Sequence, residues 1–405
     1  MPSDVDTGTG HEGVGGGPAL HGTVVPVSGV DADLLARWRD LARRSQPTNP
    51  FFEPDVVLAA ARHLEDGDRV LLVCVRAGER LVFLLPVLDR VRYRRRLPVR
   101  TVTMWAHLYC SLGTPLLDPA HGGAGWTAAL DAMRAARLSA WLVVELCDES
   151  SAEQACTAAR RSGRAARITA RESRAVVRRG PIEDYLAAHV SAQRRKKMRQ
   201  VRQRITTTLG VEPVVVDRMA GAPPVDRAAA LEEFLQLEAS GWKGREGGAF
   251  AARPHHAAFF REASAGLAAG GRLQLLSLQS AGRTLAMDCN IVSDDGLFDF
   301  KIAYDEELAR FSPGILLMAE QLRTFAGSGL AFMDSCADPD NETMNAMYQD
   351  RRPLATLFVQ VRGRRGALAV RYAGTGKHVR ERVAAVRYDA SAAFRRLRRW
   401  GTTNG

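Results

Sequence analysis

The most informative polar residues occupy one predicted hairpin, RTLAMDCNIVSDDGLFDFKIAYD. If Ser293–Gly296 forms its turn, Asn290 faces Asp299 across the two strands and Asp288 faces Lys301. Strand alternation then puts these four polar side chains on one face, while the other face is apolar. Because buried polar groups are costly unless they are paired, this pattern predicts either a wet cross-strand ion pair or the lining of a cleft.

The polar face carries groups that can accept and return protons. Asp288 or Asp299 can act as a general base. Tyr304 is an alternative acid, although strand alternation directs it to the opposite face. We predict catalytic roles for Asp288 and Lys301 and substrate contacts for Asp299 and Tyr304.

A second chemical feature follows the hairpin, where YDEELARFSPGILLMAEQLRTF predicts a loop and then an apolar helix. Ser312 suits the N-cap, and Pro313 suits the first helical position. Gly314 costs roughly 0.5–1 kcal/mol relative to alanine in a first turn, which is explained if a ligand approaches the backbone. Free N–H groups and Arg310 therefore predict a pyrophosphate site at this helix start. Its predicted residues are Arg310, Phe311, Ser312, Pro313, Gly314, Ile315 and Leu316.

Further candidates flank these two features. Asp334 and Cys336 end the next predicted strand, LAFMDSC, and we predict a catalytic role for Asp334. Cys336 is either a packed thiol or a nucleophile, and we assign it to substrate contact together with Arg352, which can bind an anionic acceptor. Trp242 and Lys243 lie in a glycine-rich loop, and we assign both to substrate contact, with the Trp as a packing lid or a stacking platform.

The composition limits the class of protein. The chain has 405 residues and a formal net charge of +11, which favours anionic partners or reflects a general preference for arginine. Its six scattered cysteines form no CxxC pair, so we predict no metal site and no disulfide framework. No apolar run reaches the roughly 20 residues of a membrane span, and no signal pattern opens the chain. We therefore expect a cytoplasmic protein that needs no metal.

The order of predicted elements divides the chain into two α/β units. Residues 21–180 form the first unit, residues 181–210 a basic helical connector, and residues 211–365 the second unit. Residues 1–20 are a predicted disordered tail. Residues 366–405 are a basic tail whose SAAFRRLRRW stretch predicts a short amphipathic helix, docked on the protein or on an anionic membrane.

The connector has seven basic residues and no acidic residue between Arg194 and Arg204. One interpretation is a solvated helix face with Met198, Val201 and Ile205 as its buried stripe. The other is a cationic face for an RNA, a nucleotide tail or a phospholipid surface.

Three segments together resemble a known family. LEASGWKGREGGAF, KIAYDEELARFSPGILL and MDSCADPDN…RRP are similar to the acetyltransferase domain of the CelD-like, cellulose-biosynthesis-associated group of GNAT proteins. The resemblance covers about residues 181–360 well and residues 22–180 loosely. It implies an α/β (α+β) fold with two GNAT-like domains in tandem, each a mixed, mostly antiparallel sheet flanked by helices.

The resemblance also implies an activity. GNAT proteins move an acetyl or acyl group from a coenzyme A thioester to an amine, here on a small molecule, a saccharide or a peptide. The loop RFSPGI departs from the common GNAT loop Q/R-x-x-G-x-G/A, because it has one glycine shifted by a residue. The CelD-like group is also similar to the FemABX proteins, which carry two GNAT-like domains and transfer amino acids from tRNA. Two alternatives follow: a FemABX-like transferase with tRNA on Arg194–Arg204, and a non-catalytic scaffold that binds an anionic polymer or a membrane.

Overall fold

The computed structural model describes residues 19–94 and 97–373, without the side chains of residues 92–94, 97, 98 and 242. The predicted tail helix SAAFRRLRRW and most of the predicted N-terminal tail lie outside the described residues. Within them, the structure has no helix long and apolar enough to cross a membrane.

One order of elements, β-α-α-β-β-β-α-β-α-β, occurs twice along the chain. The first set is β1 (Leu20–Pro26), α1 (Ala32–Arg44), α2 (Pro54–His63), β2 (Leu71–Ala77), β3 (Arg80–Arg94), β4 (Leu97–Met104), α3 (Gly122–Ala135), β6 (Trp141–Asp148), α4 (Glu149–Arg161) and β7 (Ala166–Arg178). The second set is β8 (Val214–Asp217), α7 (Pro224–Ser240), α9 (Pro254–Ala269), β9 (Leu273–Ser280), β10 (Arg283–Val292), β11 (Gly296–Tyr304), α10 (Pro313–Gly327), β12 (Phe332–Asp334), α11 (Glu342–Met347) and β13 (Asp350–Gln360). The predicted fold class, mixed α/β with largely antiparallel sheet flanked by helices, is confirmed.

The remaining elements are connectors and additions. Helices α5 (Ile182–His189) and α6 (Ala192–Leu209) join the two halves, and α12 (Gly363–Arg371) follows the last strand. The short elements are β5 (Leu116–Leu117), α8 (Trp242–Arg245) and η6 (Glu306–Phe311).

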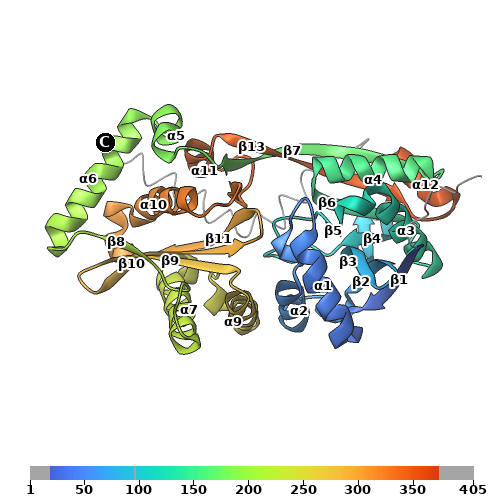
Figure 1. Ribbon diagram of the computed structural model, residues 1–405, viewed down its shortest axis with the longest axis horizontal. Coiled ribbons are helices and arrows are strands. Elements are labelled where there is room, and N and C mark those ends of the chain that lie inside the picture. The colour runs from blue at the N-terminus through green and yellow to red at the C-terminus, as the bar shows by residue number, and fades with distance from the viewer. Residues whose placement is uncertain (1–18, 95–96, 374–405) are drawn as a thin grey trace, which may run out of the picture.

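The two halves share one sheet by exchanging their last strands. The strand order is β1-β2-β3-β4-β6-β13-β7-β12-β11-β10-β9-β8. Strand β7 ends the first half but pairs with β12 of the second, and β13 ends the second half but pairs with β6 of the first. Figure 1 shows β7 and β13 running side by side across the junction of the halves.

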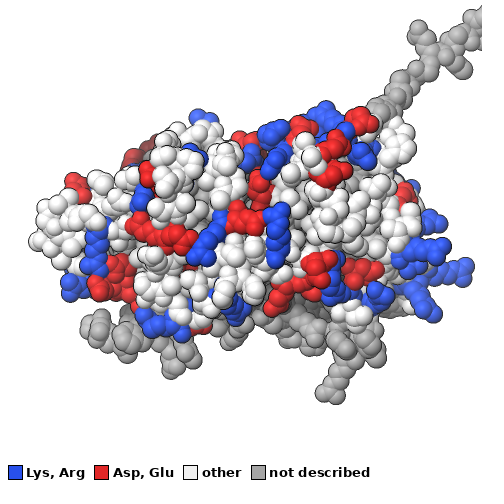
Figure 2. Space-filling view, turned by 90° about the horizontal axis from the view of Figure 1, so that it is seen from below, with Lys and Arg blue, Asp and Glu red and all other residues white. Residues whose placement is uncertain are grey.

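Helices cover both faces of this sheet. Figure 1 shows α1, α2, α7 and α9 below it and α4, α6 and α10 above it. Helices α2 and α9 pack against each other across the junction, where Glu262 binds His63 at 2.7 Å. On the face seen from below, acidic and basic side chains lie next to each other in several groups, separated by broad uncharged areas (Figure 2).

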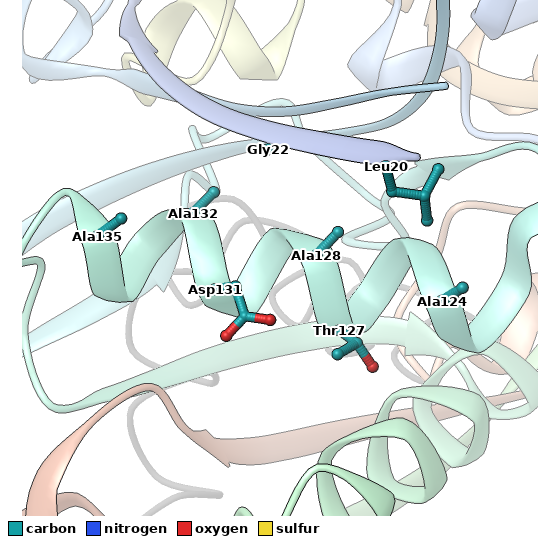
Figure 3. Close-up of a pocket in the computed structure, with 8 residues that line it drawn as sticks. All are labelled: Leu20, Gly22, Ala124, Thr127, Ala128, Asp131, Ala132 and Ala135. Carbon is teal, nitrogen blue, oxygen red and sulfur yellow. The ribbon is translucent and has the colours of Figure 1, made fainter. Parts of the chain in front are cut away.

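Strand β1 passes very close to α3 at the far edge of the first half. A Cβ added to Gly22 would lie 2.6 Å from the Ala128 carbonyl oxygen, so the packing of β1 on this helix requires glycine. Beside this contact is a hollow of about 540 Å³ lined mainly by small side chains (Figure 3). Asp131 is the charged residue among the described residues that line it.

Helix α6 has the buried stripe that the first interpretation of the connector predicts. Val201 and Ile205 are buried against α10 and β9, and Met198 packs against a neighbouring cluster, as the predicted stripe requires. Ser191 caps the helix by accepting a hydrogen bond from the Arg194 N–H at 3.2 Å, as its residue type favours.

Candidate active site

A β-bulge reorganises the polar hairpin. The predicted turn Ser293–Gly296 forms, and Asn290 pairs with Asp299 as expected. The register then shifts, so that Cys289 pairs with Lys301 and Phe300 is the extra residue. The predicted pairing of Asp288 with Lys301 is therefore wrong.

The bulge also changes which side chains share a face. Since paired residues point the same way, Lys301 lies with Cys289 on the α7 and α9 face, opposite to Asp288. Ile302 pairs with Asp288, and Tyr304 with Ala286, so both lie on the α10 face. The expectation that Tyr304 points away from Asp288 is wrong for the same reason.

Asp299 belongs to a buried hydrogen-bond network on the α10 face. Its carboxylate accepts hydrogen bonds from the Tyr348 hydroxyl and from Gln321 Nε2, both at 2.8 Å. Gln321 Nε2 also donates to Asn290 Oδ1 at 3.0 Å. Burial and the nearby Asp288 carboxylate raise the pKa of Asp299 well above its usual range. These contacts of Asp299 are with other parts of the protein, and its contact with substrate stays a prediction.

Asp288 is the carboxylate on this face whose titration suits proton transfer. It is 3% exposed, and burial raises its pKa to about 7. The hydrogen bond with Asn290 and the positive charge of Lys243 lower this pKa, but by less than burial raises it. A base with a pKa near neutrality combines the right protonation state with enough driving force for proton transfer. The predicted role of Asp288 thus has a physical basis, although no ligand tests it.

A second polar cluster, which we call the acceptor cluster, lies on the opposite face and consists of Glu238, Lys243 and Lys301. Glu238 Oε2 accepts a hydrogen bond from the Phe250 N–H at 2.8 Å. Its other oxygen, Oε1, is buried without a hydrogen-bond partner and lies 3.9 Å from Lys243 Nζ and 3.7 Å from Lys301 Nζ. Such an oxygen can accept a hydrogen bond from a ligand.

The two lysines of the acceptor cluster are held differently. Lys243 Nζ donates to the Ile302 carbonyl at 2.5 Å, and burial and the charge of Lys301 lower its pKa to about 8. Lys301 Nζ lies 5.1 Å from the centre of the Phe250 ring and 5.6 Å from that of Tyr109. These rings favour a cation at this position.

The first half of the chain contributes to the acceptor cluster through Tyr109. Its ring stacks on Phe259 of α9 with centroids 5.2 Å apart, and its hydroxyl lies 2.6 Å from His256 Nδ1. The loop between β4 and β5 therefore forms a wall beside Lys301. Neither Tyr109 nor Glu238 was among the residues predicted from the sequence. The one available signal was the position of Glu238 in the segment LEASGWKG, beside Trp242 and Lys243.

The start of α10 differs from its predicted capping. Ser312 occupies the predicted N-cap position, with φ 49° and ψ 54°, but its side chain makes no capping hydrogen bond. Its carbonyl oxygen accepts from the N–H groups of Ile315 at 3.0 Å and Leu316 at 3.4 Å. Pro313 holds the first helical position as predicted.

Only part of the predicted pyrophosphate segment is accessible. The side chains of Phe311, Pro313 and Leu316 are buried, while Gly314 and Ile315 are half-buried and Arg310 is exposed. A Cβ on Gly314 would make ordinary contacts, at 3.6 Å with Ile302 and 3.7 Å with Tyr304. Packing within the protein therefore does not require glycine at this position.

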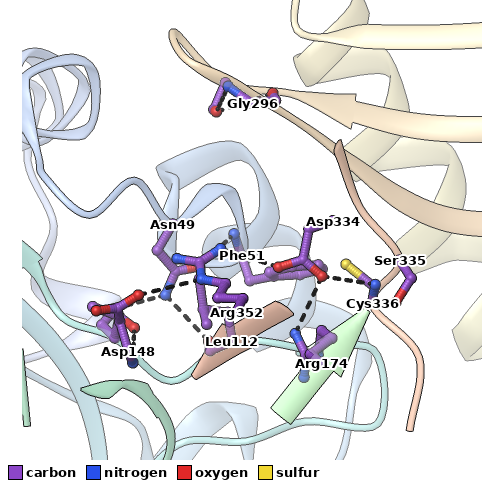
Figure 4. Close-up of polar contacts among 12 residues, drawn as sticks. Asn49, Phe51, Leu112, Asp148, Arg174, Gly296, Asp334, Ser335, Cys336 and Arg352 are labelled. Atoms are coloured by element: carbon purple, nitrogen blue, oxygen red, sulfur yellow. Dashed lines mark hydrogen bonds and ion pairs between the residues drawn. The ribbon is translucent and has the colours of Figure 1, made fainter. Parts of the chain in front are cut away.

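Asp334 lies in a buried ion network at the junction of the halves (Figure 4). It is fully buried and accepts from Arg352 Nη1 at 3.0 Å and from the Cys336 N–H at 2.9 Å. Arg174 Nη1 lies 3.7 Å from Asp334 Oδ1, the oxygen that accepts from the Cys336 N–H. Arg352 Nε also donates to Asp148 at 3.3 Å. These contacts hold the carboxylate within the protein, and the catalytic role of Asp334 stays a prediction.

Cys336, Arg352 and Trp242 complete the predicted set. Burial raises the pKa of the Cys336 thiol well above its usual value, which opposes a nucleophilic role. Arg352 is 8% exposed and bridges Asp334 and Asp148, so its predicted contact with substrate would compete with these ion pairs. Trp242 begins α8 beside Lys243, and its side chain lies outside the described residues.

Six of the seven basic residues of α6 divide into two groups, and the seventh, Arg194, is half-buried. Arg195 donates to three carbonyls at the end of α5, and Arg202 pairs with Glu212 and Glu320, so both are structural. Four others are exposed and have no acidic partner among the described residues: Lys196, Lys197, Arg199 and Arg204.

The family comparison identifies the class of domain that carries this geometry. Residues 192–342 match the model of the acetyltransferase (GNAT) domain family. The matched span runs from α6 to the start of α11 and includes Asp288, the acceptor cluster and the start of α10. The chain thus carries a GNAT acetyltransferase domain and is an acyltransferase.

Solved structures of similar fold align with both halves of this chain. FemX shares 9% identity over 80% of this chain and 95% of its own, with a TM-score of 0.54. The C-terminal domain (DUF2156) of a protein described as a lysylphosphatidylglycerol synthetase, from Agrobacterium fabrum, shares 13% identity over 84% and 95%, with a TM-score of 0.50. At these identities the similarity shows the fold alone. No curated protein matches the chain.

The ion network predicts a stability effect at Asp334. Replacing it in Asp334→Asn leaves Arg174 and Arg352 buried without their shared carboxylate, so we expect the free energy of unfolding to fall by about 3–5 kcal/mol. Urea denaturation measures this change. Asp340→Asn, on the exposed loop that follows, is the matched control and should change stability by less than about 0.5 kcal/mol. A similar small effect for Asp334→Asn would contradict the structural role.

Proposed function

We propose that the protein transfers an acyl group from a coenzyme A thioester to an amine acceptor. The observation that carries this proposal is the start of α10, where half-buried Gly314 and exposed Arg310 lie within the matched GNAT span. Since packing does not require glycine there, close approach of a ligand to the backbone explains its presence. The narrower CelD-like assignment and a cytoplasmic location remain proposals.

The residues at this helix start fit a pyrophosphate. The Gly314 N–H and the partial positive charge of the helix start attract an anion, and Arg310 adds a full charge. Coenzyme A, when bound, would supply the acyl group as a thioester. Tyr304 lies on the same face beside Gly314, which supports it as the acid that returns a proton to the leaving thiolate.

The acceptor amine is proposed to lie against the acceptor cluster. Glu238 Oε1 would accept an N–H hydrogen bond from the amine, and Tyr109 and Phe250 would form the wall. Asp288 lies on the other face of the sheet, so it would take the proton that the amine loses on attacking the thioester carbonyl by way of Lys243, whose charge acts on Asp288 and whose Nζ binds the Ile302 carbonyl. The amide C–N bond then forms as the C–S bond breaks. The acceptor class, a small-molecule, saccharide or peptide amine, remains a proposal.

Gly314→Glu tests the donor site. The added side chain brings bulk and negative charge to the proposed pyrophosphate position, so we expect coenzyme A to bind at least about tenfold more weakly. Thermal unfolding against coenzyme A concentration measures this, because a ligand of the folded state raises the melting temperature. Gly327→Glu, exposed at the other end of α10, is the control and should keep wild-type binding.

Two results would contradict the donor proposal. One is the absence of any stabilisation of the wild type at millimolar coenzyme A. The other is equal coenzyme A binding by Gly314→Glu and wild type.

Asp288→Asn tests the proton acceptor. The carboxylate acts as a base only when it is deprotonated, so wild-type kcat/KM should fall tenfold per pH unit below about pH 7, the raised pKa of Asp288. We expect kcat/KM of the variant to be about 100- to 10,000-fold lower, and we expect its plot against pH to lack the limb that falls below about pH 7. A limb set by ionisation of the acceptor amine itself should remain in both proteins. A variant that keeps the limb near pH 7 would exclude Asp288 as the base.

Glu238→Gln tests the acceptor cluster. Loss of the charged hydrogen bond to the amine should raise the acceptor KM by roughly 10- to 100-fold while coenzyme A binding stays unchanged. Steady-state kinetics with each substrate varied in turn separate these effects. Glu232→Gln is the control, because Glu232 lies on the same helix but binds Arg261 at the surface. An unchanged acceptor KM in Glu238→Gln would remove this residue from the acceptor site.

Aminoacyl transfer from tRNA is the second candidate function. It is favoured by the exposed, unpaired basic residues of α6 and by the fold similarity to FemX over most of both chains. On this alternative the wild type binds tRNA with strong salt dependence, and neutralising Lys196 and Lys197 weakens binding. Coenzyme A stabilisation without tRNA binding would reject it.

A further inference from the structure

A basic hollow lies far from the candidate active site. It has a volume of about 760 Å³ and is enclosed by the end of α4, the start of β7 and α12. Five arginines line it, and none of the described residues in its lining is acidic: Arg160, Arg164, Arg167, Arg364 and Arg371. Figure 1 shows α12 at the opposite end of the molecule from α6 and α10.

Most of this positive charge is uncompensated. Arg164 pairs with Asp131, outside the hollow. Arg160 and Arg167 donate only to carbonyl oxygens, those of Ala166 at 3.5 Å and Arg371 at 3.2 Å. The side chains of Arg364 and Arg371 form no ion pair with the described residues. Guanidinium groups that converge on a hollow suit phosphate groups, which they bind in a bidentate manner.

An exposed apolar pair adjoins these arginines on α12. Leu368 is 56% exposed and Tyr372 is 62% exposed, four residues apart at the end of one helix face. Helical geometry puts them between Arg364 on one side and Arg365 on the other. Large apolar side chains that stay exposed among cations are typical of a surface that contacts lipid, whereas a nucleic-acid backbone would gain little from them.

We propose that this end of the protein docks on an anionic phospholipid layer. The arginines of the hollow hold headgroup phosphates, and Leu368 and Tyr372 enter the region between headgroups and acyl chains. Residues 374–405 carry eight basic and two acidic residues, and this net positive charge is of the sign that an anionic layer attracts. This docking is independent of the proposed acyl transfer, because it uses none of the same residues.

Vesicle sedimentation of the full-length protein tests the docking. We expect binding to phosphatidylcholine vesicles that contain phosphatidylglycerol, and weak binding to phosphatidylcholine alone. Each basic residue at an anionic surface contributes about a fivefold factor, so Arg364→Gln with Arg371→Gln should weaken binding about 25-fold. Leu368→Ser should also weaken binding, with the melting temperature unchanged because this side chain is exposed.

The matched control is Arg199→Gln with Arg204→Gln on α6, which removes the same charge at the other end of the molecule. It should bind within about twofold of wild type. Equal weakening in both double variants would mean unspecific attraction and would overturn the proposal, as would unchanged binding when Arg364 and Arg371 are replaced. Thermal stabilisation by glycerol phosphate without vesicle binding would identify a soluble phosphate ligand and would also overturn membrane docking.

Discussion

The exchange of β7 and β13 is the constraint on which the rest of the structure depends. Because each half ends in a strand that pairs with the other half, neither half completes its own sheet. The exchange also brings Arg174 of β7 and Arg352 of β13 to the buried carboxylate of Asp334. Buried charges are tolerated only when they are paired, so this network is stable only with both strands in place. The two halves therefore form one cooperative unit.

The bulge at Phe300 organises the candidate site within this frame. One extra residue sends Lys301 toward Glu238 and sends Ile302 and Tyr304 toward the start of α10. Without it, Lys301 would neutralise Asp288 directly across the hairpin. With it, Asp288 feels only the more distant charge of Lys243, and burial keeps its pKa near 7.

The sequence predicted the features that local chemistry decides. The turn at Ser293–Gly296 and the start of α10 at Pro313 both depend on a few adjacent residues. The bulge could not be predicted, because a one-residue shift leaves an alternating pattern that reads equally well in either register. The strand exchange could not be predicted from the sequence either, because both halves contain the same order of elements whichever half their last strand pairs with.

The missed residues share a physical cause. Glu238 is buried because a loop twelve residues later supplies the Phe250 N–H, and Tyr109 reaches Lys301 from the other half of the chain. Such contacts depend on tertiary packing, which no local pattern records. The left-handed backbone of Ser312 could not be predicted either, because the sequence Ser-Pro-Gly favours an ordinary serine cap.

The two faces of the candidate site draw on different parts of the chain. The proposed donor face is built from η6 and α10, both inside the matched span 192–342. The acceptor cluster is closed by Tyr109, which lies outside that span and is held there by stacking on Phe259. A change in the loop that carries Tyr109 can therefore alter the wall beside Lys301 without disturbing the helix start at Gly314. We infer that acceptor choice depends on the first half, while the donor side follows from the GNAT domain itself.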